Sequence, residues 1–401
     1  MIDTSLKISA CILAFTLSAC GGGGGSTTAS SVIASGDYTS SNIAPNAITF
    51  SVQNINGNNI NLPYVSVNIC QPGTTKCQTV PNILLDTGSI GLRVLSSALG
   101  NLQLTSQTYN NAPVAECASF LSGVTWGPVK IADIRMSSEV ASSLPIQVIN
   151  DVNYENVPTR CSNGFPTLQT SSSLNANGIL GVGLLIADGQ SYYACALNLG
   201  ANCTANTVPI PPSAQVQNPV AAFAINNNGV VMNLPSISSS GATSVTGSLY
   251  FGVDTQANNS SSGASIIPTD RFGYFTTTFN GVATRTSFID SGSNGLFFPA
   301  GNQSAVLTPC TISQGFYCPA STQSYTATVP LKNNATGTIN FSIANLESQL
   351  VTRNAAFNNV GGPLQSYFDW GLPFFFGKTV YFGITDKASA NNIGPYYGYK
   401  N

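Results

Sequence analysis

Residues 83–94 read ILLDTGSIGLRV and carry an acid, Asp86, at the end of an apolar run. A hydroxyl residue, a glycine and a second hydroxyl residue follow the acid, and the chain then becomes apolar again. Such a run predicts a β-strand that ends in a tight loop bearing a carboxylate. The glycine, Gly88, permits a backbone turn that a side chain would obstruct.

The arrangement returns around Asp290 in residues 287–298, SFIDSGSNGLFF. Over the seven positions that start at each Asp, five are identical in the two copies. One Asp-Thr-Gly alone is more often an ordinary turn at a strand end. Two copies with matching apolar flanks instead predict two similar lobes that each supply one carboxylate. Helical periodicity is sparse elsewhere, which indicates a mostly β protein.

The composition excludes several classes of protein. Charged residues make up only 7% of the chain, and the net charge is −2. The 13 Lys and Arg residues are scattered, so nucleic-acid binding has little support. The chain has no histidine, which removes Ser-His-Asp and Cys-His catalysis and most zinc sites. We therefore expect no metal and no other cofactor, and carboxylates are the natural acid and base for any hydrolysis.

The N-terminus has the features of an export signal. Lys7 precedes an apolar run at residues 8–17 that is too short to span a membrane. Residues 17–20, LSAC, are similar to a bacterial lipobox, in which Cys20 would carry the lipid. The residue after this cysteine is Gly21, which resembles the pattern of lipoproteins that are sorted to the outer membrane of Gram-negative bacteria. Residues 1–20 would then be a lipoprotein signal peptide that ends at Cys20. The alternative is an ordinary secretory signal with a chance cysteine. Residues 21–45 would form a Gly/Ser/Thr-rich tether.

Eight cysteines follow this segment, an even number that predicts disulfides in an exported protein. Their spacing suggests three local pairs and leaves two cysteines over for a fourth. The expected pairs are Cys70–Cys77, Cys195–Cys203, Cys310–Cys318 and, by elimination, Cys117–Cys161.

The two acid loops resemble those of the pepsin-like aspartic peptidases. That resemblance implies a mostly β, bilobal acid protease fold, with two related β-barrel lobes and a cleft between them. We place the lobes at residues 46–212 and 213–401. In that family each lobe has a later apolar-apolar-glycine segment, which residues 179–181 (ILG) and 375–377 (FFG) match. The chain also resembles a family of bacterial lipoproteins of unknown function.

The resemblance implies a role for each loop residue. Asp86 and Asp290 match the catalytic pair. The supporting positions are those that turn each loop, lock the loops together or bond the outer carboxylate oxygens: Thr87, Gly88, Ser89, Ser291, Gly292 and Ser293.

This chain departs most from the family's pattern in the segment that matches the family's flap hairpin. Phe120 stands where the family has a tyrosine, and Arg93 stands where it has a tryptophan. Trp126, near the expected hairpin tip, is the other flap candidate. Four other acids have no motif around them and are interpreted as turn or capping residues: Asp133, Asp188, Asp254 and Asp369. Residues 395–399 are interpreted as a surface tail.

We expect a monomeric, lipid-anchored endopeptidase of the cell envelope that acts on a peptide or protein substrate. An Asp pair would activate the water that attacks the peptide bond. The alternative is a catalytically weak or inactive binding protein, held to the membrane by the same anchor, that uses the two-lobed cleft for a peptide or glycan.

Overall fold

The computed structural model describes residues 44–55, 57, 59–196, 203–301 and 306–401. The predicted signal peptide, the predicted lipidation site Cys20 and nearly all of the predicted tether lie outside these residues. Within the described part of the chain, no helix has the length and apolar character needed to cross a membrane.

Strands dominate both halves of the chain, and the helices are short. The first half contains β1 (Ala47–Val52), β2 (Pro63–Cys70), β3 (Cys77–Asp86), β4 (Ile90–Leu95), β5 (Thr105–Ser106), β6 (Thr108–Tyr109), β7 (Ala112–Phe120), β8 (Gly123–Met136), β9 (Glu139–Ile149), β10 (Gly178–Val182) and β11 (Ser191–Ala194). The second half contains β12 (Gly229–Leu234), β13 (Val245–Phe251), β14 (Ser265–Pro268), β15 (Phe275–Phe279), β16 (Val282–Ile289), β17 (Leu296–Phe298), β18 (Gln323–Pro330), β19 (Thr336–Ile343), β20 (Gly361–Pro363), β21 (Phe368–Trp370), β22 (Lys378–Gly383) and β23 (Tyr396–Lys400). The α-helices are α1 (Thr159–Ser162), α2 (Ser171–Leu174) and α3 (Leu346–Leu350). Single turns of 3₁₀-helix include η1 (Ser96–Ala98), η2 (Pro212–Ala214), η3 (Val220–Ala222), η4 (Ala257–Asn259), η6 (Lys332–Asn334) and η7 (Leu372–Phe374).

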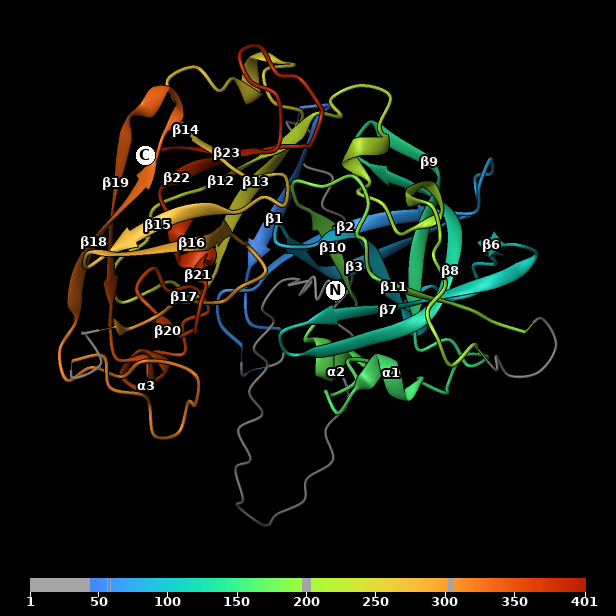
Figure 1. Cartoon of the computed structure of the whole chain (residues 1–401), viewed down its shortest axis with the longest axis horizontal. Helices are drawn as coiled ribbons and strands as arrows, with labels where there is room; N and C mark the ends of the chain where they lie inside the picture. Colours follow the sequence, from blue (N-terminus) through green and yellow to red (C-terminus); the bar gives the residue numbers. More distant parts are fainter. Residues whose placement is uncertain (1–43, 56, 58, 197–202, 302–305) are drawn as a thin grey trace, which may run out of the picture.

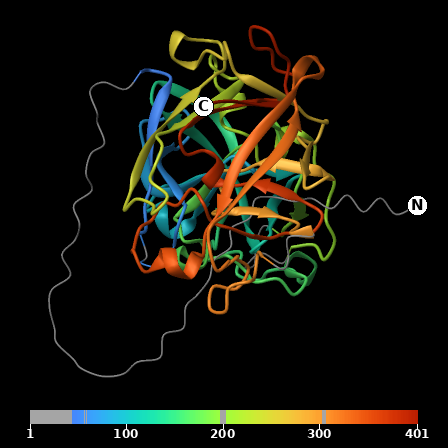
Figure 2. The ribbon, with the colours of Figure 1, turned by 90° about the vertical axis from the view of Figure 1, so that its left-hand side faces the viewer.

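The strands form two sheets that give the molecule its bilobal, pepsin-like shape (Figure 1). The larger sheet runs from β11 and β7 through β3, β2 and β1 into β13, β12, β22, β23 and β14. The smaller sheet has the order β19-β18-β15-β16-β21-β17-β20. Strand β1 pairs with β13 along its whole length, so the central strands join the two halves of the chain. In Figure 2 the β18–β19 hairpin, which forms one edge of the smaller sheet and is drawn in orange, faces the viewer.

Each acid loop lies in the same three-strand arrangement. In the first, β3 leads into the Asp86 loop, β4 follows it, and β10 inserts between them, parallel to β3 and antiparallel to β4. In the second, β16 leads into the Asp290 loop, and β21 inserts in the same way between β16 and β17. The two repeated sequences therefore fold into two copies of one structural unit.

The second inserted segment is not the one predicted from the apolar-apolar-glycine pattern. Residues 179–181 do lie in β10, where Gly181 pairs with Asp86. Residues 375–377 instead lead into β22 of the central sheet, where Gly377 bonds the backbone of Leu234. The inserted strand is β21, which is followed by Gly371, and its middle residue is Asp369. The strand was not predicted because Asp369 stands at a position where the pattern requires an apolar residue.

Two further expectations are corrected by packing. Residues 395–399 are not a surface tail, because β23 pairs with β22 and β14 and its tyrosines are buried. Trp126 does not lie near a hairpin tip, since β8 runs unbroken through it as a 14-residue strand. The tight turn between β7 and β8 lies at residues 121–122.

All four expected disulfides are present: Cys70–Cys77, Cys117–Cys161, Cys195–Cys203 and Cys310–Cys318. Such a set is typical of proteins in an oxidising, exported compartment. The bridge of longest sequence separation, 44 residues, joins Cys117 of β7 to Cys161 of α1. It therefore ties the hairpin that would serve as the flap to the body of the first lobe.

Candidate active site

The two acid loops meet face to face and bring the carboxyl groups of Asp86 and Asp290 together. Both side chains are fully buried, and they are hydrogen-bonded to each other. The backbone N–H of Gly88 donates to Oδ1 of Asp86 at 2.8 Å and to Oδ1 of Asp290 at 3.1 Å. One donor therefore reaches both inner oxygens.

The outer oxygens have matching partners in the two loops. Ser89 Oγ donates to Asp86 Oδ2 at 2.5 Å, and Ser293 Oγ donates to Asp290 Oδ2 at 2.8 Å. Gly292 N–H adds a bond of 2.7 Å to Asp290 Oδ1. These bonds fix the plane of each carboxyl group before any substrate arrives.

Hydroxyl groups lock one loop to the other. Ser291 N–H donates to Thr87 Oγ1 at 2.8 Å, and Thr87 N–H donates to Ser291 Oγ at 3.1 Å. The Ser291 hydroxyl donates in turn to the Leu85 carbonyl at 2.8 Å. The reciprocal pair crosses between the lobes, so the position of one acid depends on the fold of the other lobe.

Burial makes it costly for both acids to carry charge. Burial, and next the charge of Asp290, raises the pKa of Asp86 well above its usual range. Burial also raises the pKa of Asp290, while hydrogen bonds from Asp86, Ser293 and Gly292 lower it. These directions favour a pair that carries one proton, with the hydrogen of the bond between the two acids on Asp86.

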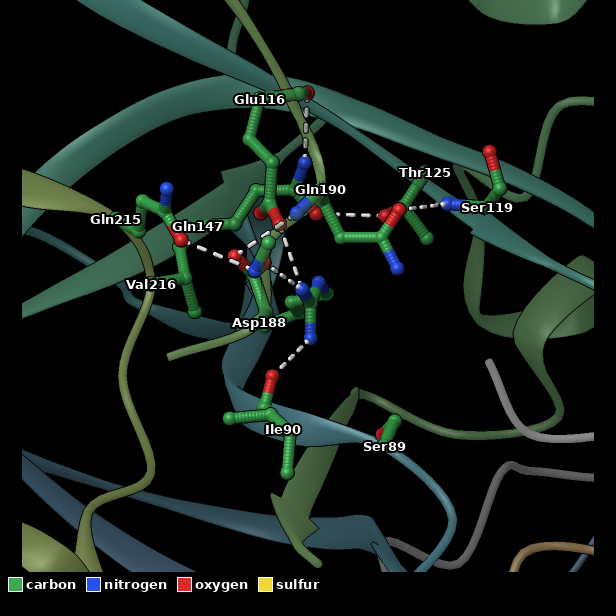
Figure 3. Close-up of polar contacts among 12 residues, drawn as sticks. Ser89, Ile90, Glu116, Ser119, Thr125, Gln147, Asp188, Gln190, Gln215 and Val216 are labelled. Carbon is green, nitrogen blue, oxygen red and sulfur yellow. Dashed lines mark hydrogen bonds and ion pairs between the residues drawn. The ribbon is translucent and has the colours of Figure 1, made fainter. Parts of the chain in front are cut away.

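A second buried charged cluster lies just behind the first acid loop, on β4 and β7 (Figure 3). Arg93, at the predicted tryptophan position, donates to the Ile90 carbonyl at 2.7 Å. Its other terminal nitrogen contacts Glu116 and Asp188, each at 2.6 Å. Asp188 also accepts a bond of 2.6 Å from the Tyr192 hydroxyl. The cluster joins the acid loop, strand β7 and the segment after β10.

The protonation of this cluster follows from its burial. Burial raises the pKa of Glu116 well above its usual range, the positive charge of Arg93 lowers it, and the nearby Asp188 raises it again. The raised pKa favours the neutral form of Glu116, which can still accept the hydrogen bond from Arg93. Burial alone would lower the pKa of Arg93, but the two acids raise it, so the guanidinium stays charged.

The flap candidates lie in the core of the first lobe. Phe120 ends β7, and its ring packs with Leu84 and Ile179 while Arg93 lies 5.7 Å from the ring centre. Trp126 is fully buried, and its indole N–H donates to the Tyr154 carbonyl at 2.9 Å. No phenol stands at the predicted tyrosine position. The contact between Phe120 and Arg93 takes the place of the expected aromatic pair.

The interpretation of isolated acids as turn or capping residues is right for two and wrong for two. Asp133 accepts backbone bonds from Gly73 and Ser143. Asp254 accepts bonds from Ser261 in the same way. Asp188 is instead part of the Arg93 cluster, and Asp369 is a buried neighbour of Asp290. Their sequence surroundings resemble those of turn acids, so only long-range pairing distinguishes them.

Comparison with known proteins agrees with this geometry. A family model described as "Protein of unknown function (DUF3443)" matches residues 40–399. The crystal structure of the aspartic proteinase from Irpex lacteus is similar, with a TM-score of 0.51, 14% sequence identity and coverage of 88% of this chain and 97% of that one. No curated protein matches the sequence. At this identity the likeness shows the fold alone. The chain therefore belongs to the DUF3443 family and has the bilobal fold of the pepsin-like aspartic proteinases.

Proposed function

We propose that this protein is an aspartic endopeptidase of the cell envelope, exported through its N-terminal signal and anchored by a lipid on Cys20. The proposal rests above all on one observation. Asp86 and Asp290, on repeated loops, share a hydrogen bond and the N–H of Gly88 in a site that disfavours double ionisation.

The geometry supports a division of roles between the two acids. Asp290 is the carboxylate that takes a proton from water, because the hydrogen bond between the two acids lowers the pKa of Asp290 and raises that of Asp86. The water oxygen then attacks the peptide carbonyl carbon, and Asp86 gives its proton to the carbonyl oxygen. Asp290 returns its proton to the leaving amine as the C–N bond breaks. One hydroxyl group of the tetrahedral intermediate gives its proton to Asp86 as the new carboxyl group forms, which restores the protonated Asp86.

The alternative function, a binding protein on the same fold, has its support in the flap. Phe120 cannot supply the phenol that the resemblance leads one to expect, and its ring is packed into the core. A binding protein of this kind would hold a peptide or glycan without cleaving it.

A peptide library separates the two functions. We expect the purified protein to cleave library peptides at acidic pH, with products identified by mass spectrometry. A statine-type peptide, whose hydroxyl imitates the tetrahedral intermediate, should block cleavage. Binding of library peptides without cleavage at any pH from 3 to 7 would contradict the enzyme and favour the binding protein.

A further inference from the structure

Asp369 is a third buried acid beside the pair. It is the middle residue of β21, which runs parallel to β16 directly before Asp290. The Asp290 N–H donates to the carbonyl of the next residue, Trp370, at 3.1 Å. Asp369 pairs with Phe288, and side chains alternate along a strand, so Asp369 and Asp290 lie on the same face.

The first lobe has an apolar residue at the matching place. There Leu84 pairs with Ile179, just as Phe288 pairs with Asp369 in the second lobe. Ile179 packs into an apolar cluster and needs no polar partner. The two lobes therefore differ by one carboxyl group at a position that touches the catalytic unit.

Among the described residues, no cation acts on Asp369 to compensate a charge. The residue is 0% exposed, and neither carboxyl oxygen makes a hydrogen bond of ordinary geometry. A buried carboxylate without partners is far more costly than a neutral acid. The Ser293 hydroxyl lies near enough to lower the pKa of Asp369, but burial and the charge of Asp290 raise it well above its usual range.

Ser293 connects this acid to the pair. Its hydroxyl has one hydrogen, which it donates to Asp290 Oδ2 at 2.8 Å. The same hydroxyl oxygen can accept a hydrogen bond from another group. A protonated Asp369 can supply that bond, and an ionised Asp369 cannot.

The titratable groups that act on Asp369 all favour the neutral acid. Asp290 at the end of β16 and Asp86 at the end of β3 both raise the pKa of Asp369. The third, Tyr397 of β23, has its own pKa raised by burial and stays uncharged. Among the described residues that act on Asp369, none is a cation.

We propose that Asp369 is a positioning residue of the site, a neutral acid that donates a hydrogen bond to Ser293 and thereby keeps Asp290 the ionised member of the pair. This role deepens the proposed peptidase function and rests on it. An ionised Asp369 would repel the Asp290 carboxylate and reverse the effect.

The acidic limb of the kcat/KM profile tests this role. In Asp369→Ile, which copies Ile179, the support to Ser293 is lost and the pKa of Asp290 rises. We expect the acidic limb to move up by about one pH unit. Asp369→Asn keeps a donor and should keep the wild-type limb. Ile179→Val is the packing control and should not move it. An unmoved limb in Asp369→Ile, or an equal shift in both variants, overturns the proposal.

A second measurement needs no enzymatic activity. A carboxyl with a raised folded-state pKa stabilises the fold below its unfolded pKa, and this stability is lost as pH rises. Wild type should therefore lose Tm relative to Asp369→Asn between pH 4 and pH 7. The loss should shrink in an Asp290→Asn background, where the repelling charge is gone. A difference in Tm that is constant with pH, or equal in both backgrounds, overturns the neutral acid. If the protein cleaves no peptide but the Tm difference shows this pH dependence, the peptidase function is refuted and the neutral Asp369 is not.

Discussion

The glycines of the acid loops are required by the acid of the opposite lobe. A Cβ on Gly88 would lie 2.5 Å from Asp290 Cγ, and one on Gly292 would lie 2.7 Å from Asp86 Oδ1. Neither glycine has a positive φ, so the backbone alone would accept alanine. The constraint is the close approach of the two lobes.

Gly88→Ala should therefore separate the acids. We expect kcat/KM to fall at least about a hundredfold, because a displacement of about 1 Å is enough to cost that much. Unfolding in urea should show a loss of about 1–3 kcal/mol from overpacking. Gly281→Ala, at an exposed turn with no atom within 4 Å of the added Cβ but with a φ of +77°, is a control for the rate alone and should keep the wild-type rate. A Gly88→Ala variant with wild-type kcat/KM would show that the loops are not held this closely.

Among elements, the Arg93 cluster sets the position of the hairpin formed by β7 and β8. One guanidinium on β4 contacts an acid on β7 and another after β10. The sequence identified Arg93 as a departure from the family pattern. It did not identify Glu116 or Asp188 as partners, because those residues come together only when three distant segments pack.

Removing the cation should destabilise this arrangement. Arg93→Met leaves two acids buried together, and we expect a loss of about 3–5 kcal/mol in the free energy of unfolding, measured in urea at pH 7. Glu116→Gln removes a group that is already neutral and should cost less. The exposed Arg285→Met is the matched control. A loss below about 1 kcal/mol in Arg93→Met would show that the buried contacts of Arg93 do not hold the hairpin.

The sequence predicted one inserted strand correctly and the other incorrectly, for a physical reason. Residues 179–181 have the apolar character that a strand buried on both faces requires. Asp369 breaks this character in β21, whereas residues 375–377 keep it and so match the pattern better. A buried acid is costly and therefore rare, so a pattern built on apolar residues misses it. Because a buried acid is costly, its presence at position 369 next to Asp290 indicates a role in the site.

Across the whole molecule, the repeated motif was enough to predict the bilobal fold and the meeting of the two loops. The disulfide pairs followed from spacing and elimination because three of the bridges are local. The part of the larger sheet that joins the two lobes was not predicted, since β1 pairs with β13, which lies far along the chain. The lobe boundary at residues 212 and 213 stays a prediction.

The buried acids also make the stability of the whole molecule depend on pH. The folded-state pKa values of Asp86 and Asp290 lie above the unfolded value of about 3.9, so their contribution is complete below about pH 4 and is lost as pH rises. We expect Asp86→Asn to gain stability relative to wild type between pH 4 and pH 7, measured by urea unfolding at each pH. A difference that does not change with pH would contradict the raised pKa values.

The most direct test of the account is the rate of peptide cleavage by Asp86→Asn and Asp290→Asn, measured beside wild type at its optimal pH. Asp254→Asn, in a turn away from the pair, is the matched control. Each dyad variant should lose at least about a thousandfold in kcat, because general acid–base catalysis and the shared proton are both removed. The control should keep the wild-type rate. A dyad variant that cleaves as fast as wild type would contradict catalysis by the paired acids.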